Sequence, residues 1–149
     1  MCIRDRTKDA VEKFFERYEQ FYMQSLKEAV DATEISELYA PEFIGASPFG
    51  VMTAKNDANF RQALEQGYEQ YRKIGTKEMR VCNIEVLPID ELHCIARVSW
   101  RATYETAKCQ NIEIDFDVHY LMQEQNGKLN VFGWISGDEQ SVLKEQGVL

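Results

Sequence analysis

The sequence lacks the features that mark several large classes of protein. It contains no apolar run of about 18 residues, which a membrane-spanning helix needs. Acidic residues outnumber basic ones by 25 to 17, and the net charge of −8 repels phosphate backbones. Motifs for cofactors and metals are also missing, because there is no GxGxxG, no P-loop and no HExxH. We therefore expect no membrane, no nucleic acid, no cofactor and no metal as partners.

The four cysteines are irregularly spaced. Cys2, Cys82, Cys94 and Cys109 form no CxxC pair and match no zinc-binding pattern. We interpret them as small buried side chains and reduced thiols, which is typical of a cytoplasmic protein. The opening MCIRDR has no apolar stretch of the kind found in signal peptides. We interpret residues 1–7 as a disordered or non-native tail, and 8–149 as one domain.

What the sequence does contain is a helical hydrophobic pattern followed by a strand pattern. Apolar residues recur at spacings of three and four along 8–28, which predicts a long amphipathic helix. A candidate capping box, Asp31 with Glu34, begins a short helix to about residue 39. A third helix is predicted from Asn56, as its cap, to Gly75.

After the third helix the period changes from 3.6 to 2, and Asn126-Gly127 is a hairpin signal. The segment 49–56 is interpreted as a loop and a candidate lid, and a short closing helix is predicted after Asp138. The strands are predicted at 43–47, 78–87, 92–106, 111–124 and 128–136. Helices followed by a meander of strands indicate the α+β class, with a curved antiparallel sheet wrapped around the long helix.

Alternation along two strands assigns their faces. Val98, Trp100 and Tyr104 share one side of the first strand, and Val118 and Tyr120 share one side of the second. We expect this apolar side to face the helices. The opposite side carries the remaining, mostly charged residues, among them His119, which we interpret as a surface histidine. We expect Arg97 and Arg101 to form cross-strand ion pairs with Asp115 and Asp117.

The order of elements, the segment LYAPEFIGASPFG at 38–50 and the closing hairpin with NGKL resemble the nuclear-transport-factor-2-like superfamily. That superfamily includes ketosteroid isomerases and the SnoaL-like polyketide cyclases. The resemblance implies a cone-shaped, cystatin-like α+β barrel with an apolar pocket at its wide end. It also implies a homodimer, which we expect to form through the outer face of the sheet.

Ketosteroid isomerases use a tyrosine, an aspartate base and a protonated aspartate. By resemblance the tyrosine corresponds to Tyr18, in the dipeptide Arg17-Tyr18. The base corresponds to Ser47, before the second proline of LYAPEFIGASPFG, and the acid to Val118 in FDVHYLM. Serine without a basic neighbour cannot accept a proton near neutral pH, and valine cannot donate one. Isomerisation of the steroid type is therefore not expected.

The main hypothesis is that the chain binds a small, mostly apolar molecule in an aromatic pocket. The residues predicted to line this pocket are Tyr18, Ser47, Phe60, Trp100, Tyr120 and Trp134. A first alternative is a cyclase, dehydratase or isomerase that uses a different acid, such as Asp138 or Asp117, whose pKa would be raised by burial. Asp138 is also a candidate helix cap. A second alternative is a non-catalytic dimerisation module whose interior is filled by its own side chains.

Overall fold

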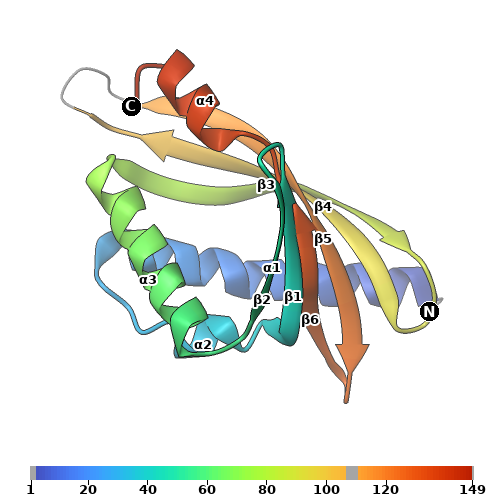
Figure 1. The fold of residues 1–149 in the computed structure, drawn as a ribbon. Coiled ribbons are helices and arrows are strands. Elements are labelled where there is room, and N and C mark those ends of the chain that lie inside the picture. Colours follow the sequence, from blue (N-terminus) through green and yellow to red (C-terminus); the bar gives the residue numbers. More distant parts are fainter. Residues whose placement is uncertain (1–2, 107–110, 149) are drawn as a thin grey trace.

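In a computed structural model the chain forms a curved, unclosed six-stranded sheet with helices packed on one face (Figure 1). The structure describes residues 3–106 and 111–148. The helices are α1 (Ile3–Lys27), α2 (Thr33–Ser36), α3 (Ala58–Lys73) and α4 (Glu139–Glu145). The strands are β1 (Tyr39–Ser47), β2 (Gly50–Lys55), β3 (Thr76–Pro88), β4 (His93–Tyr104), β5 (Ile112–Gln125) and β6 (Lys128–Ile135). The predicted α+β class is confirmed.

The strand order is β2-β1-β6-β5-β4-β3. All neighbours pair antiparallel except β1 with β6, which are parallel; the helix α3 and four strands separate them in the sequence, and this leaves the long connection that a parallel pair needs. Asn126 and Gly127 both have positive φ, 52° and 76°, in the two-residue turn that joins β5 to β6. These are the dihedrals of the tight hairpin that the Asn-Gly pair predicts.

The predicted faces of β4 and β5 are confirmed. Val98, Trp100 and Tyr104 are at most 1% exposed, and Val118 lies with them in the core. On the other face Arg97 pairs with Asp117 at 2.8 Å, and Arg101 pairs with Asp115 at the same distance. The period of two places every second side chain against α1 and the charged ones in solvent.

The helix boundaries differ from the prediction at two caps. Asp57, and not Asn56, caps α3 by accepting a hydrogen bond from the amide of Phe60 at 3.0 Å. The side chain of Asn56 instead donates to the carbonyls of Ser36 and Tyr39. Asp31 accepts from the amide of Thr33 in a turn before α2, and is not its cap. Each predicted cap therefore lies one residue before the actual one.

The first helix begins at Ile3, five residues before the predicted start, so its backbone extends into the segment interpreted as a tail. The apolar stripe that predicted it is buried, with Val11 and Phe15 fully inaccessible to solvent. None of the described helices is long and apolar enough to span a bilayer.

The segment 49–56 is not a loop, and the prediction of a lid is wrong. Residues Gly50–Lys55 form β2, an edge strand that pairs antiparallel with β1. Its side chains are exposed on both faces, so it has no apolar–polar alternation that the sequence could show. Phe49 and Val51 are 80% and 67% exposed at this edge.

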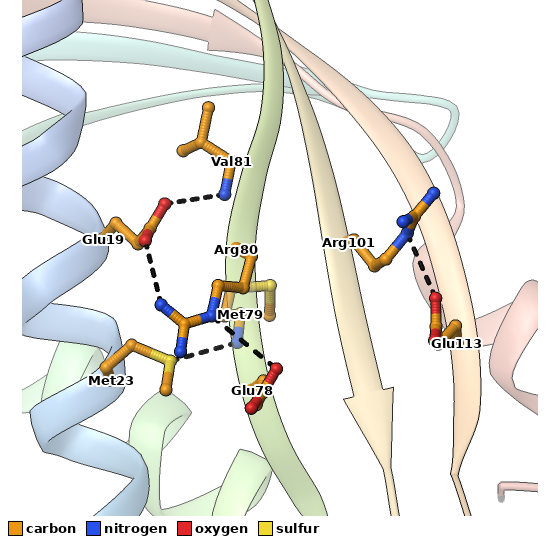
Figure 2. A network of polar contacts seen from close by, with 8 residues as sticks. All are labelled: Glu19, Met23, Glu78, Met79, Arg80, Val81, Arg101 and Glu113. Carbon is orange, nitrogen blue, oxygen red and sulfur yellow. Dashed lines mark hydrogen bonds and ion pairs between the residues drawn. The ribbon is translucent and has the colours of Figure 1, made fainter.

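The opposite edge, β3, is covered by α1 (Figure 2). The carboxylate of Glu19 accepts a hydrogen bond from the amide of Val81 at 2.8 Å and pairs with Arg80 at 3.4 Å. The amide of Met79 points to the sulfur of Met23 at 3.5 Å. Backbone groups that an edge strand would otherwise leave free for another strand are thus occupied by side chains of the helix.

Candidate functional site

The described interior is dominated by aromatic rings. All seven tyrosines of the chain belong to one core between α1, α3 and the inner face of the sheet. We call this set the tyrosine cluster; its members are Tyr18, Tyr22, Tyr39, Tyr68, Tyr71, Tyr104 and Tyr120. The helix stripes and the strand alternation converge there, because each places its aromatic positions on the inner side.

Three of the predicted lining residues lie at the centre of this cluster. The ring of Tyr18 is 5.8 Å from Trp100 and 6.2 Å from Tyr120, between centroids. The indole nitrogen of Trp100 donates a hydrogen bond to the hydroxyl of Tyr120 at 3.2 Å. The Tyr18 hydroxyl is hydrogen-bonded to that of Tyr39. Tyr18, Trp100 and Tyr120 are packed against other rings and are at most 6% exposed.

Phe60 and Trp134 form a second aromatic group beside the first. Phe60 packs on Phe43 with ring centroids 4.5 Å apart, and Trp134 packs on Phe43 at 5.4 Å. Both also contact Tyr39, which links the two groups. Gly45 makes room for the indole, since a Cβ there would lie 2.8 Å from Cζ2 of Trp134.

A hollow of about 420 Å³ opens at the β1–β2 hairpin, and we call it the hairpin hollow. Its lining residues are Gly45, Ala46, Ser47, Phe49, Gly50, Val51, Met52, Trp134 and Ser136. Ser47 is partly exposed there and its hydroxyl accepts a hydrogen bond from the amide of Phe49 at 3.2 Å. The structure therefore brings Ser47 and Trp134 together at this hollow.

Strand register connects the hairpin hollow to the tyrosine cluster. Gly45 is paired with Met52 on β2 and with Trp134 on β6, and Trp134 is paired with Tyr120 on β5. Paired residues on neighbouring strands share a face, so this row runs along the inner side from the hairpin to the cluster. Five of the six predicted residues are joined to it through ring contacts or pairing, and Ser47 lies at its open end.

A larger hollow, of about 1100 Å³, lies at the other end of the molecule, where α1 begins. Buried Phe14 and Leu38 line it, with charged groups such as Arg17, Glu37 and Lys128 around them. None of the six predicted residues lines it. In the described part of the chain, no three His, Cys, Asp or Glu side chains are placed to hold a metal ion.

Two hydroxyls in the tyrosine cluster, those of Tyr68 and Tyr104, are buried without a hydrogen-bond partner among the described residues. Tyr68, on α3, is 4% exposed, and its hydroxyl makes no hydrogen bond to the described residues. Burial raises the pKa of Tyr68 well above its usual value, and it does the same for Tyr18 and Tyr120. These hydroxyls stay protonated at neutral pH and can donate hydrogen bonds. A buried donor without an acceptor is costly unless something else accepts from it.

A carboxyl group that the sequence analysis missed meets the same cluster. Glu139, the first residue of α4, is partly buried and accepts a hydrogen bond from the Tyr71 hydroxyl, at 3.1 Å from one oxygen and 3.3 Å from the other. Burial raises the pKa of Glu139, and the bond from Tyr71 opposes that shift. The only feature of the sequence that could have pointed to Glu139 is its position next to the cap residue Asp138.

Neither of the two acids considered from the sequence lies in the interior. Asp138 caps α4, accepting from the amide and hydroxyl of Ser141 at 3.0 and 2.6 Å, and these bonds lower its pKa. Asp117 is on the outer face, where Ser99 and Arg97 lower its pKa. A raised pKa was the property expected of a catalytic acid, so both assignments are wrong, and the interpretation of Asp138 as a cap is confirmed.

Comparison with known proteins agrees with this architecture. Three similar structures share 12% of their residues with the chain, which shows the fold alone. An NTF-2 like protein of unknown function from Shewanella oneidensis MR-1 has a TM-score of 0.66, over 89% of this chain and 99% of that one. A protein from Novosphingobium aromaticivorans DSM 12444 named "putative scytalone dehydratase" gives 0.61, over 89% and 84%. A "putative polyketide cyclase" from Xanthomonas campestris pv. campestris gives 0.59, over 99% and 100%.

No curated protein matches the sequence at a significant level. One family model does, described as NTF2-like protein (DUF6841), and it covers residues 7–139. That range includes the whole sheet, the tyrosine cluster and Glu139. The chain therefore belongs to the NTF2-like family DUF6841.

Proposed function

We propose that this protein binds a small, mostly apolar, ring-bearing molecule between the hairpin hollow and the tyrosine cluster. The observation that carries the proposal is the unpartnered hydroxyl of Tyr68, buried among rings. Such a donor is suited to an oxygen atom on an otherwise apolar ligand. The hairpin hollow supplies the way in, and Trp134 connects it to the rings behind.

The free energies of ring burial and of one hydrogen bond favour a flat ligand with one polar group. Burial of about 200 Å² of ring surface contributes roughly 5 kcal/mol at 25 cal/mol per Å². The hydrogen bond from Tyr68 adds about 1 kcal/mol and fixes the orientation. Ring–ring contacts in the second aromatic group, such as Phe43 with Trp134, are of the kind that an aromatic ligand would continue.

The experiment uses 2-naphthol and naphthalene as matched probes. The two tryptophans of the chain, Trp100 and Trp134, belong to the aromatic interior, so their fluorescence reports binding directly. We expect 2-naphthol to bind more tightly than naphthalene. In Tyr68→Phe the affinity for 2-naphthol should fall about fivefold, which is one hydrogen bond, while that for naphthalene stays unchanged. If neither probe changes the fluorescence or the melting temperature, the interior is filled by its own side chains and the proposal fails.

We also propose that the outer face of the sheet forms a homodimer. The support is its composition. The ion pairs of Arg97 and Arg101 lie on this face, and the strand register puts exposed Ile135 in the same row as Arg97, with exposed Leu87 two residues after the β3 partner of Arg97. Charged pairs set register and exposed apolar groups supply burial in such contacts. Light scattering after size-exclusion chromatography measures the mass directly, and a single monomer mass at high concentration would overturn it.

A further inference from the structure

We propose that β2 pairs with the β2 strand of a second copy of this chain, so that two sheets join edge to edge. The contact is antiparallel about a two-fold axis at Thr53. It uses the open edge of the sheet and is distinct from the dimer proposed for the outer face. It needs no ligand, so it is independent of the binding site proposed above.

The two edges of the sheet differ in how they meet solvent. At β3 the amides of Met79 and Val81 point to side chains of α1, and a shift in register at Cys82 interrupts the pairing with β4. At β2, the outermost strand on the other side, six consecutive pairs with β1 follow without a shift (Figure 1). The strand contains no proline, and Lys55 at its end is its only charged residue. A regular, nearly uncharged edge of this kind is a template for another strand.

The register with β1 shows which backbone groups of β2 face the open side. Ser47 and Gly50 are paired across the two-residue turn of the hairpin, and such a closing pair exchanges hydrogen bonds. Every second residue after Gly50 therefore bonds to β1. The amide of Asn56, which donates to the carbonyl of Pro41 at 2.9 Å, continues the same series just beyond the strand.

The residues between them direct their backbone groups away from β1. They are Val51, Thr53 and Lys55, and no residue of the described chain accepts a hydrogen bond from their amides. All three side chains are exposed, so nothing in the described structure stands where an incoming strand would lie. The edge thus presents three amide donors at the spacing of an antiparallel ladder.

The side chains of β2 complement a second copy of the same strand. In an antiparallel pair about Thr53, the two threonines lie opposite each other, and Val51 of each copy lies opposite Lys55 of the other. Threonine pairs are favourable across strands, and valine can pack on the aliphatic part of a lysine. Lys55 does not lie opposite itself, so no like charges meet across the contact.

Exposed apolar side chains add to these backbone bonds. Val51 and Met52 are 67% and 54% exposed, and they lie on opposite faces of β2. A strand added beside β2 would cover part of both, and Met52 belongs to the wall of the hairpin hollow. One edge of six residues is small beside the about 1,200 Å² of a stable interface, so we expect the contact to form only at high protein concentration.

The test measures mass by sedimentation equilibrium between about 10 µM and about 1 mM protein. It uses Arg101→Glu, in which the outer-face dimer is expected to be lost, and the mass should rise from monomer to dimer over this range. Adding Thr53→Pro removes the outward N–H at the axis but no bond to β1, so this variant should stay monomeric. The matched control, Thr53→Val, keeps the N–H and should still dimerise.

A charge swap tests the register itself. Val51→Lys puts a lysine opposite Lys55 twice in each dimer and should weaken dimerisation about tenfold. Adding Lys55→Glu turns both pairs into pairs of opposite charge and should restore the association. The matched control adds Lys13→Glu instead, on the exposed surface of α1, which gives the same net charge and should restore nothing.

Three results would overturn the proposal. The first is Arg101→Glu remaining monomeric over the whole concentration range. The second is Thr53→Pro dimerising as strongly as Thr53→Val, and the third is Lys55→Glu failing to restore the association of Val51→Lys. Far-ultraviolet circular dichroism checks that each variant is folded, and if Thr53→Pro does not fold, the charge swap decides alone. Failure of the ligand proposal appears separately, in the titration with 2-naphthol.

Discussion

Replacing tyrosine by phenylalanine should have different effects on the free energy of unfolding at two positions of the tyrosine cluster, Tyr68 and Tyr120. The hydroxyl of Tyr68 has no hydrogen-bond partner in the part of the chain that the structure describes, whereas that of Tyr120 accepts from the indole nitrogen of Trp100 at 3.2 Å. Both residues are at most 6% exposed, so Tyr→Phe removes one buried oxygen at either position and leaves the ring in place. The difference between the two variants therefore isolates the hydrogen bonding of the hydroxyl.

The magnitudes follow from this difference. Removing an unsatisfied buried hydroxyl recovers part of its desolvation cost, so Tyr68→Phe should leave the free energy of unfolding unchanged or raise it by up to about 2 kcal/mol. Tyr120→Phe leaves the N–H of Trp100 buried without an acceptor, and should lower the free energy of unfolding by about 1–3 kcal/mol.

Urea unfolding followed by far-ultraviolet circular dichroism measures both variants. Circular dichroism is preferred to fluorescence because Tyr120→Phe alters the environment of Trp100 itself. The reasoning is refuted if Tyr68→Phe destabilises the protein by more than about 1 kcal/mol, since its hydroxyl would then have a partner. It is also refuted if the two variants cannot be distinguished.

Three further predictions concern other parts of the molecule. Gly45→Ala places a methyl group 2.8 Å from the indole of Trp134, so we expect a loss of about 1–3 kcal/mol in urea unfolding and a shifted tryptophan emission; a variant with wild-type emission would contradict this. Burial raises the folded-state pKa of Glu139 above its unfolded value, so stability is lost as pH rises through the window between them. Glu139→Gln removes that loss, and its melting temperature relative to the wild type should rise between pH 4 and pH 8; a constant difference would show that the pKa is not raised. Arg101→Glu puts a like charge beside Asp115 on the outer face, so it should lower the mass measured by light scattering from dimer to monomer; an unchanged dimer would place the interface elsewhere.

The inner face of the sheet could be predicted because it obeys a simple physical period. Each strand alternates sides, so Trp100 and Tyr120 had to face the same way as Val98 and Val118 once the core side was chosen. The same argument excluded Asp117 from the interior. The end of α3 could also be predicted from the sequence. Gly75 follows the helix with a φ of +88°, a backbone conformation that favours glycine.

What could not be predicted depends on contacts between distant segments. The strand β2 is short and exposed on both faces, so only its pairing with β1 identifies it as a strand. The burial of Glu139 has no local sign in the sequence, because it depends on how α4 packs against β5 and on the hydrogen bond from Tyr71 of α3. The sequence pointed to its neighbour Asp138, which has the residue type and the position of a cap.

The central claim is that the tyrosine cluster receives a ring-bearing ligand, and a crystal structure of the protein grown with 2-naphthol tests it most directly. The account predicts the naphthol oxygen within hydrogen-bond distance of the Tyr68 hydroxyl, with its rings against Trp134. An interior unchanged by the ligand, with 2-naphthol bound in the larger hollow beside Phe14 or not bound at all, would contradict it.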